Sequence, residues 1–167
     1  MRRAALVLAA GMICGHASAE SAQSGVWTYT YEPSSTGKGG LVTPLSPSPS
    51  PSGDPNDPSY LVARCMNGRT ELLVGGAGGW GLPRRQISVT TRIDDAPPET
   101  KAWDVATNGK AAFLDDGVEA FLKALPEDGK LLVTVADAMG GRHETIFRTT
   151  GFGAVRAKLA EACSWAP

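Results

Sequence analysis

Residues 60–74 read YLVARCMNGRTELLV, and this stretch gives the clearest prediction of local fold in the chain. Its first half alternates: the odd-numbered residues from Leu61 to Cys65 fall on one side and the intervening residues on the other. This is the period of a half-buried strand. Asn67-Gly68 is the strongest two-residue signal for a hairpin turn, and residues 70–74 follow it directly. The stretch therefore predicts two antiparallel strands joined by a tight turn.

The regions on both sides of this hairpin carry further strand and helix signals. Strand-like segments lie at residues 25–31, 87–93, 100–104, 111–114, 131–136 and 145–149. Residues 116–125, followed by Pro126, have the helical period, and Val155, Leu159 and Ala162 share one face of a helix near the end of the chain. The pattern predicts an α+β domain: a mainly antiparallel β-sheet or sandwich with one internal and one C-terminal helix.

The first nineteen residues predict export from the cytoplasm. Arg2 and Arg3 precede the apolar run 4–13, and the small residues 17–19 match the pattern that signal peptidase cleaves, between Ala19 and Glu20. Ten apolar residues are too few for a membrane-spanning helix, which needs about 20. We expect no transmembrane segment and a periplasmic or secreted protein. A lipoprotein is disfavoured because bulky Ile13 precedes Cys14.

The charge balance argues against nucleic acid as a partner. The whole chain carries a formal charge of −1, and residues 1–19 hold two arginines and no acidic residue, so their removal leaves −3. A negative protein without a stripe of basic residues is poorly suited to bind phosphate-rich polymers. We therefore expect a protein partner in the cell envelope.

The remainder of the chain predicts a single domain interrupted by one unusual segment. Residues 20–32 supply the first strand, residues 33–58 form a Pro/Ser-rich flexible segment, and residues 59–167 form the main α+β domain. Prolines cannot donate ladder hydrogen bonds, so residues 44–52 are expected to stay out of the sheet. We interpret the segment as a tether that joins the first strand to the rest of the domain. The alternative is an exposed segment that a partner protein binds.

Two cysteines remain after removal of the signal, Cys65 and Cys163. An even number of cysteines in an oxidising compartment predicts a disulfide. The bond would join an early strand to the last turn of the chain.

The chemistry-bearing residues do not assemble into a recognisable catalytic or metal site. His143 is the only histidine beyond the signal, so it is interpreted as a surface residue. The pairs Asp94-Asp95 and Asp115-Asp116 lack the alternating ligands of a calcium loop and are assigned structural roles. We expect no catalytic residues, no cofactor and no metal.

Residues 76–81 read GAGGWG, which matches the spacing of a dinucleotide-binding loop. No helix is predicted after this loop, and such a motif requires one, so the segment is interpreted as a flexible connection. Trp80 within it, followed by Arg84 and Arg85, forms a candidate partner surface. The alternative is that Trp80 folds back onto the sheet.

An ordered set of short motifs resembles the VasI/TagO-type family of proteins associated with type VI secretion systems. The set comprises Trp27, LVARC at 61–65, GRTEL at 68–72, TRIDD at 91–95, Trp103, FLKAL at 121–125, Phe147, Gly151 and EACSW at 161–165. The resemblance implies a non-catalytic accessory protein of an envelope assembly. The alternative function is a small periplasmic hydrolase, or an inhibitor of an envelope enzyme that acts through the Trp80 loop.

Overall fold

The computed structural model describes residues 20–32, 41–42, 45–48, 58–76, 81–82, 85–137 and 139–167. In chain order the strands are β1 (Glu20–Ser24), β2 (Trp27–Glu32), β3 (Leu41–Val42), β4 (Leu45–Ser48), β5 (Ser59–Met66), β6 (Arg69–Gly76), β7 (Gln86–Ile93), β8 (Glu99–Val105), β9 (Ala111–Leu114), β10 (Lys130–Ala136) and β11 (Arg142–Arg148). The helices are α1 (Val118–Ala124), which precedes β10, and α2 (Phe152–Cys163), which follows β11.

The predicted hairpin of residues 60–74 is confirmed as β5 and β6. The two strands pair antiparallel up to Met66 opposite Arg69, which leaves Asn67 and Gly68 as the turn. Both turn residues have positive φ angles, 53° and 73°, as a tight hairpin turn of this type requires. The side chains that alternate inward along β5, from Leu61 to Cys65, are buried in the core.

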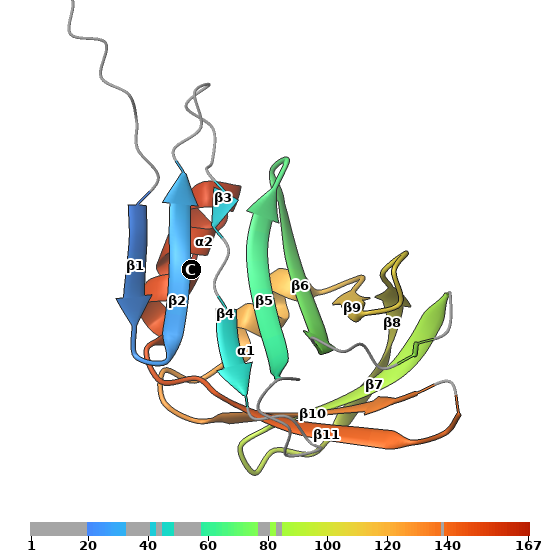
Figure 1. Cartoon of the computed structure of the whole chain (residues 1–167). Coiled ribbons are helices and arrows are strands. Elements are labelled where there is room, and N and C mark those ends of the chain that lie inside the picture. The colour runs from blue at the N-terminus through green and yellow to red at the C-terminus, as the bar shows by residue number, and fades with distance from the viewer. Residues whose placement is uncertain are drawn as a thin grey trace, which may run out of the picture.

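All the strands belong to one antiparallel sheet, so the predicted α+β class is confirmed. Its order is β1-β2-β4-β5-β6-β9-β8-β7-β10-β11, with β3 paired to β2. Figure 1 shows the sheet strongly bent, with β10 and β11 crossing below the ends of β4 and β5. A hydrogen bond of 3.2 Å from Thr145 Oγ1 to Ser59 Oγ joins the two parts of the bend.

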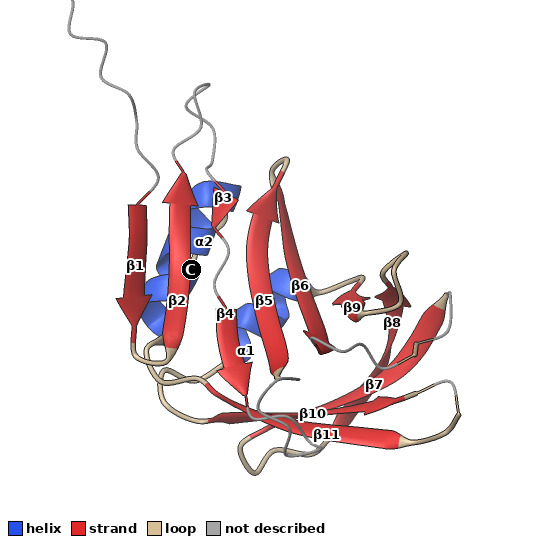
Figure 2. Ribbon diagram, in the orientation of Figure 1, coloured by secondary structure: helices blue, strands red, loops and turns tan. Residues whose placement is uncertain are grey.

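The two helices cover the inner side of the bent sheet (Figure 2). The main apolar core lies between the helices and the sheet. Phe152 of α2 packs against Trp27 of β2, with ring centroids 4.9 Å apart. Leu122 of α1 and Leu159 of α2 are fully buried in the same cluster as Trp103 of β8. Strands far apart in the sequence therefore share one main core, as expected for one domain of this size, and a smaller cluster of Val62, Leu73 and Ala111 is buried separately.

The helix α1 is shorter than the predicted helix of residues 116–125. Gly117, at φ 72°, precedes its first residue, and the Asp116 carboxylate accepts a hydrogen bond of 2.7 Å from the Gly117 amide. Leu125 is extended, as the residue before a proline usually is.

Two segments of the N-terminal region depart from expectation. Residues 20–32 form two strands rather than one, with β1 at an edge of the sheet. The sequence predicts that residues 33–58 form a flexible segment whose residues 44–52 stay out of the sheet, but β3 pairs with β2, and β4 lies between β2 and β5. Pro47 is tolerated because β4 pairs with β2 only at Leu45, so Pro47 has a ladder partner on the β5 side alone.

The predicted disulfide between Cys65 and Cys163 is confirmed, with the two Cα atoms 5.6 Å apart. It ties β5 to the last residue of α2. Beside it, the indole N–H of Trp165 donates a hydrogen bond of 2.8 Å to Thr70 Oγ1, and the Lys123 amine lies 5.3 Å from the centre of the Trp165 ring. The end of the chain is thus fixed to β6 and α1 as well.

Within the described part of the chain, no helix is both long enough and apolar enough to cross a membrane. Residues 1–19 lie outside that part, so the signal peptide and its cleavage between Ala19 and Glu20 stay predictions.

Candidate functional site

The partner surface predicted around Trp80 lies largely outside the described residues. Trp80 and Arg84 lie outside the described residues. Arg85 is exposed just before β7, and its carbonyl oxygen accepts a hydrogen bond of 2.7 Å from the amide of Val105. This surface stays a prediction, and only its Arg85 end has a known position.

A second surface, which we call the basic face, lies on the outer side of β7, β10 and β11. The strand register places Arg92, Leu132 and Ile146 in one row across the three strands. Lys130 and Arg148 are paired in the next row, two residues along β10 and β11. Opposite residues of paired strands point to the same side of a sheet, so these five side chains share the outer side.

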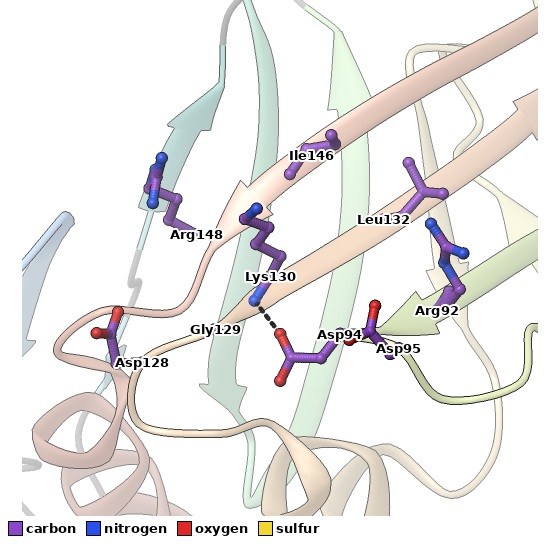
Figure 3. Close-up of a pocket in the computed structure, with 9 residues that line it drawn as sticks. All are labelled: Arg92, Asp94, Asp95, Asp128, Gly129, Lys130, Leu132, Ile146 and Arg148. Atoms are coloured by element: carbon purple, nitrogen blue, oxygen red, sulfur yellow. Dashed lines mark hydrogen bonds between the residues drawn. The ribbon is translucent and has the colours of Figure 1, made fainter.

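The basic face contains an open hollow of about 670 Å³. Figure 3 shows the side chains of Arg92, Lys130 and Arg148 spread around Leu132 and Ile146. The wall nearest the helices is completed by Asp94, Asp95, Asp128 and Gly129. Arg85 is seven residues before Arg92, about 23 Å away along an extended chain, so Arg85 is not part of the basic face.

Two of the three acidic residues in this wall hold the backbone in place. The Asp94 carboxylate accepts a hydrogen bond of 2.8 Å from the Lys130 amide, and the Asp94 amide donates one of 2.9 Å to the Lys130 carbonyl. Asp128 accepts a hydrogen bond from the Thr150 hydroxyl. The structural role assigned to Asp94 is thereby supported.

The cations of the basic face are not neutralised by these carboxylates. Among the described residues, Arg92, Lys130 and Arg148 form no ion pair, and all three are exposed. Ile146 between them is 54% exposed, which is high for a large apolar side chain on an ordered strand. Arginine beside an exposed apolar residue is a composition typical of protein interfaces.

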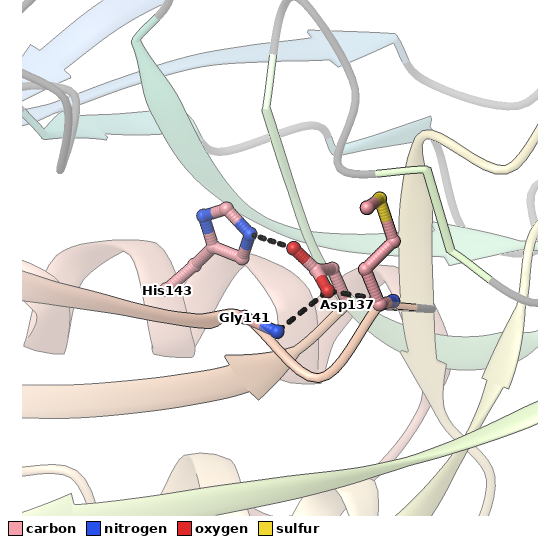
Figure 4. Close-up of polar contacts among 4 residues, drawn as sticks. Asp137, Gly141 and His143 are labelled. Atoms are coloured by element: carbon pink, nitrogen blue, oxygen red, sulfur yellow. Dashed lines mark hydrogen bonds and ion pairs between the residues drawn. The ribbon is translucent and has the colours of Figure 1, made fainter.

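His143 has a structural contact at the opposite end of β11. Its Nε2 lies 3.0 Å from Oδ2 of Asp137, and Oδ1 of Asp137 accepts hydrogen bonds from the amides of Met139 and Gly141, at 2.8 and 2.7 Å (Figure 4). The hydrogen bond from His143, followed by that from the Gly141 amide, lowers the pKa of Asp137 below its ordinary value. The half-exposed histidine therefore helps to close the β10–β11 turn.

The Asp137 contacts predict a pH-dependent stability. Because the folded state lowers the pKa of Asp137, its contribution is present above the ordinary carboxyl pKa of about 4 and is lost as the pH falls through the lower folded value. We expect Asp137→Asn to lower the melting temperature near neutral pH and to have little effect well below pH 4. Thermal unfolding of the wild type and the variant, from neutral pH to below pH 4, measures the difference in melting temperature. A difference that does not change with pH would contradict the prediction.

No described group of three or more histidine, cysteine or acidic residues is arranged to hold a metal ion. In the acidic pair Asp115-Asp116, Asp116 has the local role already seen at the start of α1. The basic face, with exposed cations that form no ion pair among the described residues, is therefore taken as the candidate site.

No protein-family model matches this sequence, and a comparison with curated proteins gives no match either. Among solved structures, the fold is similar to that of invasion associated protein b from Bartonella henselae. The TM-score is 0.51 with 12% sequence identity, over 84% of this chain and 95% of that chain. At this identity the similarity is one of fold.

Proposed function

We propose that this protein is an exported, non-catalytic accessory protein of a bacterial envelope assembly, and that it binds a protein partner through the basic face. The disulfide supports export, since such bonds persist in oxidising compartments and are rare in the cytoplasm. The fold shared with an invasion associated protein is compatible with this location.

One observation carries the choice of site: three cations without ion pairs among the described residues lie near a half-exposed isoleucine on paired strands. Strands hold side chains in a fixed arrangement, so little order must be gained when a partner binds. An isolated exposed apolar residue would need no explanation, but its position beside these cations matches the anchor of an interface.

The proposal of a non-catalytic role rests on the environment of the candidate base. General acid–base chemistry needs a side chain placed to exchange a proton with a substrate. The Nε2 atom of His143 is directed at Asp137, whose carboxylate also accepts two backbone hydrogen bonds of the same turn. This arrangement serves the turn.

The resemblance to VasI/TagO-type proteins extends the proposal to type VI secretion. The test is a deletion strain of the encoding bacterium, complemented with the wild-type gene or with the double variant Arg92→Glu/Arg148→Glu. We expect deletion to impair contact-dependent killing of a competitor strain, and the double variant to fail to restore it. The matched control is Arg142→Glu, an exposed charge reversal at the other end of β11.

The outcomes separate the two parts of the proposal. Normal killing by the deletion strain would remove the assignment to type VI secretion. Full restoration by Arg92→Glu/Arg148→Glu, at wild-type protein levels, would show that the basic face is not the binding site.

The same strain tests the non-catalytic role. We expect His143→Ala to restore function fully, because the Nε2 atom of the histidine is engaged by Asp137 of the β10–β11 turn. Its melting temperature should fall slightly through loss of the contact to Asp137. Loss of function in a folded His143→Ala protein would favour an enzyme instead.

A further inference from the structure

We infer that the ligand of the basic face is an extended, acidic protein segment that presents two carboxylates four residues apart and an apolar side chain midway between them. This inference rests on the proposed function, since it names the chemistry of the partner at the same site. It follows from the spacing of the cations, the apolar centre and the carboxylates at the border.

The spacing of the two arginines fits an extended chain. Adjacent strands lie about 4.8 Å apart and residues two positions along a strand about 6.7 Å apart, so the Cα atoms of Arg92 and Arg148 are about 12 Å apart. In an extended segment, residues i and i+4 lie about 13 Å apart and point to the same side. One arginine can therefore contact each carboxylate.

The centre of the face supplies the apolar contact. Leu132 and Ile146 are paired on β10 and β11, in the row of Arg92 and one row from Arg148. The side chain at i+2 of such a segment points to the same side as those at i and i+4. The point midway between the two arginines lies over β10, between Leu132 and Lys130, so a valine or isoleucine there would contact Leu132 and reach toward Ile146.

The charged groups favour carboxylates of a peptide. An arginine guanidinium donates two parallel hydrogen bonds to one carboxylate, and Lys130 adds a third cation beside Arg148. The exposed carboxylates of Asp94, Asp95 and Asp128 border the same hollow and would repel a continuous anionic surface. Two separated carboxylates present less negative charge to these aspartates than a continuous surface of anionic lipids does.

The test uses the full mature protein and a fluorescein-labelled peptide, GSESVSESG, whose two glutamates are four residues apart with valine between them. The control peptide GSEESVSSG has the same composition with adjacent glutamates. Fluorescence anisotropy should show binding of the first peptide that is at least about tenfold tighter than binding of the control. Raising NaCl from about 50 to about 500 mM should weaken the binding.

Variants of the protein locate the binding. Arg92→Glu/Arg148→Glu should weaken peptide binding by about tenfold or more, and the milder Arg92→Gln/Arg148→Gln should weaken it less. Arg142→Glu should stay within about twofold of wild type, apart from the small effect of net charge. Circular dichroism and melting temperature confirm that each variant is folded.

Three results would overturn the inference. The first is equal affinity for the two peptides, and the second is peptide binding that Arg92→Glu/Arg148→Glu does not change. The third is a lack of peptide binding together with arginine-dependent binding to vesicles of equal phosphatidylglycerol and phosphatidylcholine, which would assign the face to a membrane. If the double variant fails in the bacterium while the peptide does not bind, the proposed function stands and this inference alone fails.

Discussion

Replacing both Cys65 and Cys163 with alanine is expected to lower the free energy of unfolding by about 2 to 5 kcal/mol. The bond closes a long loop within the domain, because the two cysteines are 98 positions apart in the sequence. Removing the bond restores conformational freedom to the unfolded chain. In the chain-entropy model of disulfide stabilisation, a longer closed loop gives a larger stabilisation. A domain of ordinary stability, about 5 to 15 kcal/mol, would lose a large fraction of its margin.

The measurement is urea unfolding of the purified mature protein, compared with Cys65→Ala/Cys163→Ala. Adding a reductant to the wild-type protein should produce most of the same loss, while the double variant should not respond to it. A reductant response in the variant would show that another effect dominates. A difference below about 1 kcal/mol would mean that contacts such as Trp165 with Thr70 already hold the end of the chain to β6.

Local signals in the sequence were enough to predict the hairpin and most strands. The turn at Asn67-Gly68 needs positive φ angles, which glycine and asparagine adopt at low cost, and the alternation of β5 continues up to it. The segment predicted at 111–114 is strand β9. These elements are specified by neighbours in sequence, which a single chain reveals.

The missed strands lack such signals. Strand β1 reads ESAQS, which is polar, short and at an edge of the sheet. Strand β4 contains Pro47, whose missing amide argues against a strand unless one side has no partner. In both cases tertiary pairing determines the structure, and local propensity is a weak guide.

The basic face could not be found from the sequence because it depends on the strand register. Arg92 comes from β7, while Lys130 and Arg148 come from β10 and β11. The alternation along each strand does show that these residues face away from the core. It does not show which strands are neighbours, so only the pairing of β10 with both β7 and β11 brings the three cations together.

The second large effect is expected at a contact between two glycines. Gly25, in the turn between β1 and β2, has φ 56°, and Gly151, just before α2, has φ 85°. A methyl group added to Gly25 would overlap the Thr150 carbonyl, and one added to Gly151 would overlap the Ser24 carbonyl. The Val26 amide also donates a hydrogen bond of 3.1 Å to the Thr150 carbonyl. The two backbones therefore approach too closely for any side chain.

We expect Gly151→Ala to cost about 2 to 4 kcal/mol: about 1 to 2 for the left-handed backbone, and the rest for separating the β1–β2 turn from the start of α2. The control is Gly140→Ala, at φ 84°, where an added methyl meets nothing within 4 Å, so only the backbone cost should appear. Urea unfolding of both variants gives the difference. Equal losses would show that the turn can move away from α2 without cost.

The double variant Gly25→Ala/Gly151→Ala tests whether the two glycines serve one contact. Once the first methyl has separated the turn from the helix, the second meets no close carbonyl and should cost only its own backbone term. The loss in the double variant should therefore be smaller than the sum of the single losses. If the two losses of stability add fully, each glycine is required by a separate local constraint. The β1–β2 turn and α2 are then not coupled through the close backbone contact at Gly25 and Gly151.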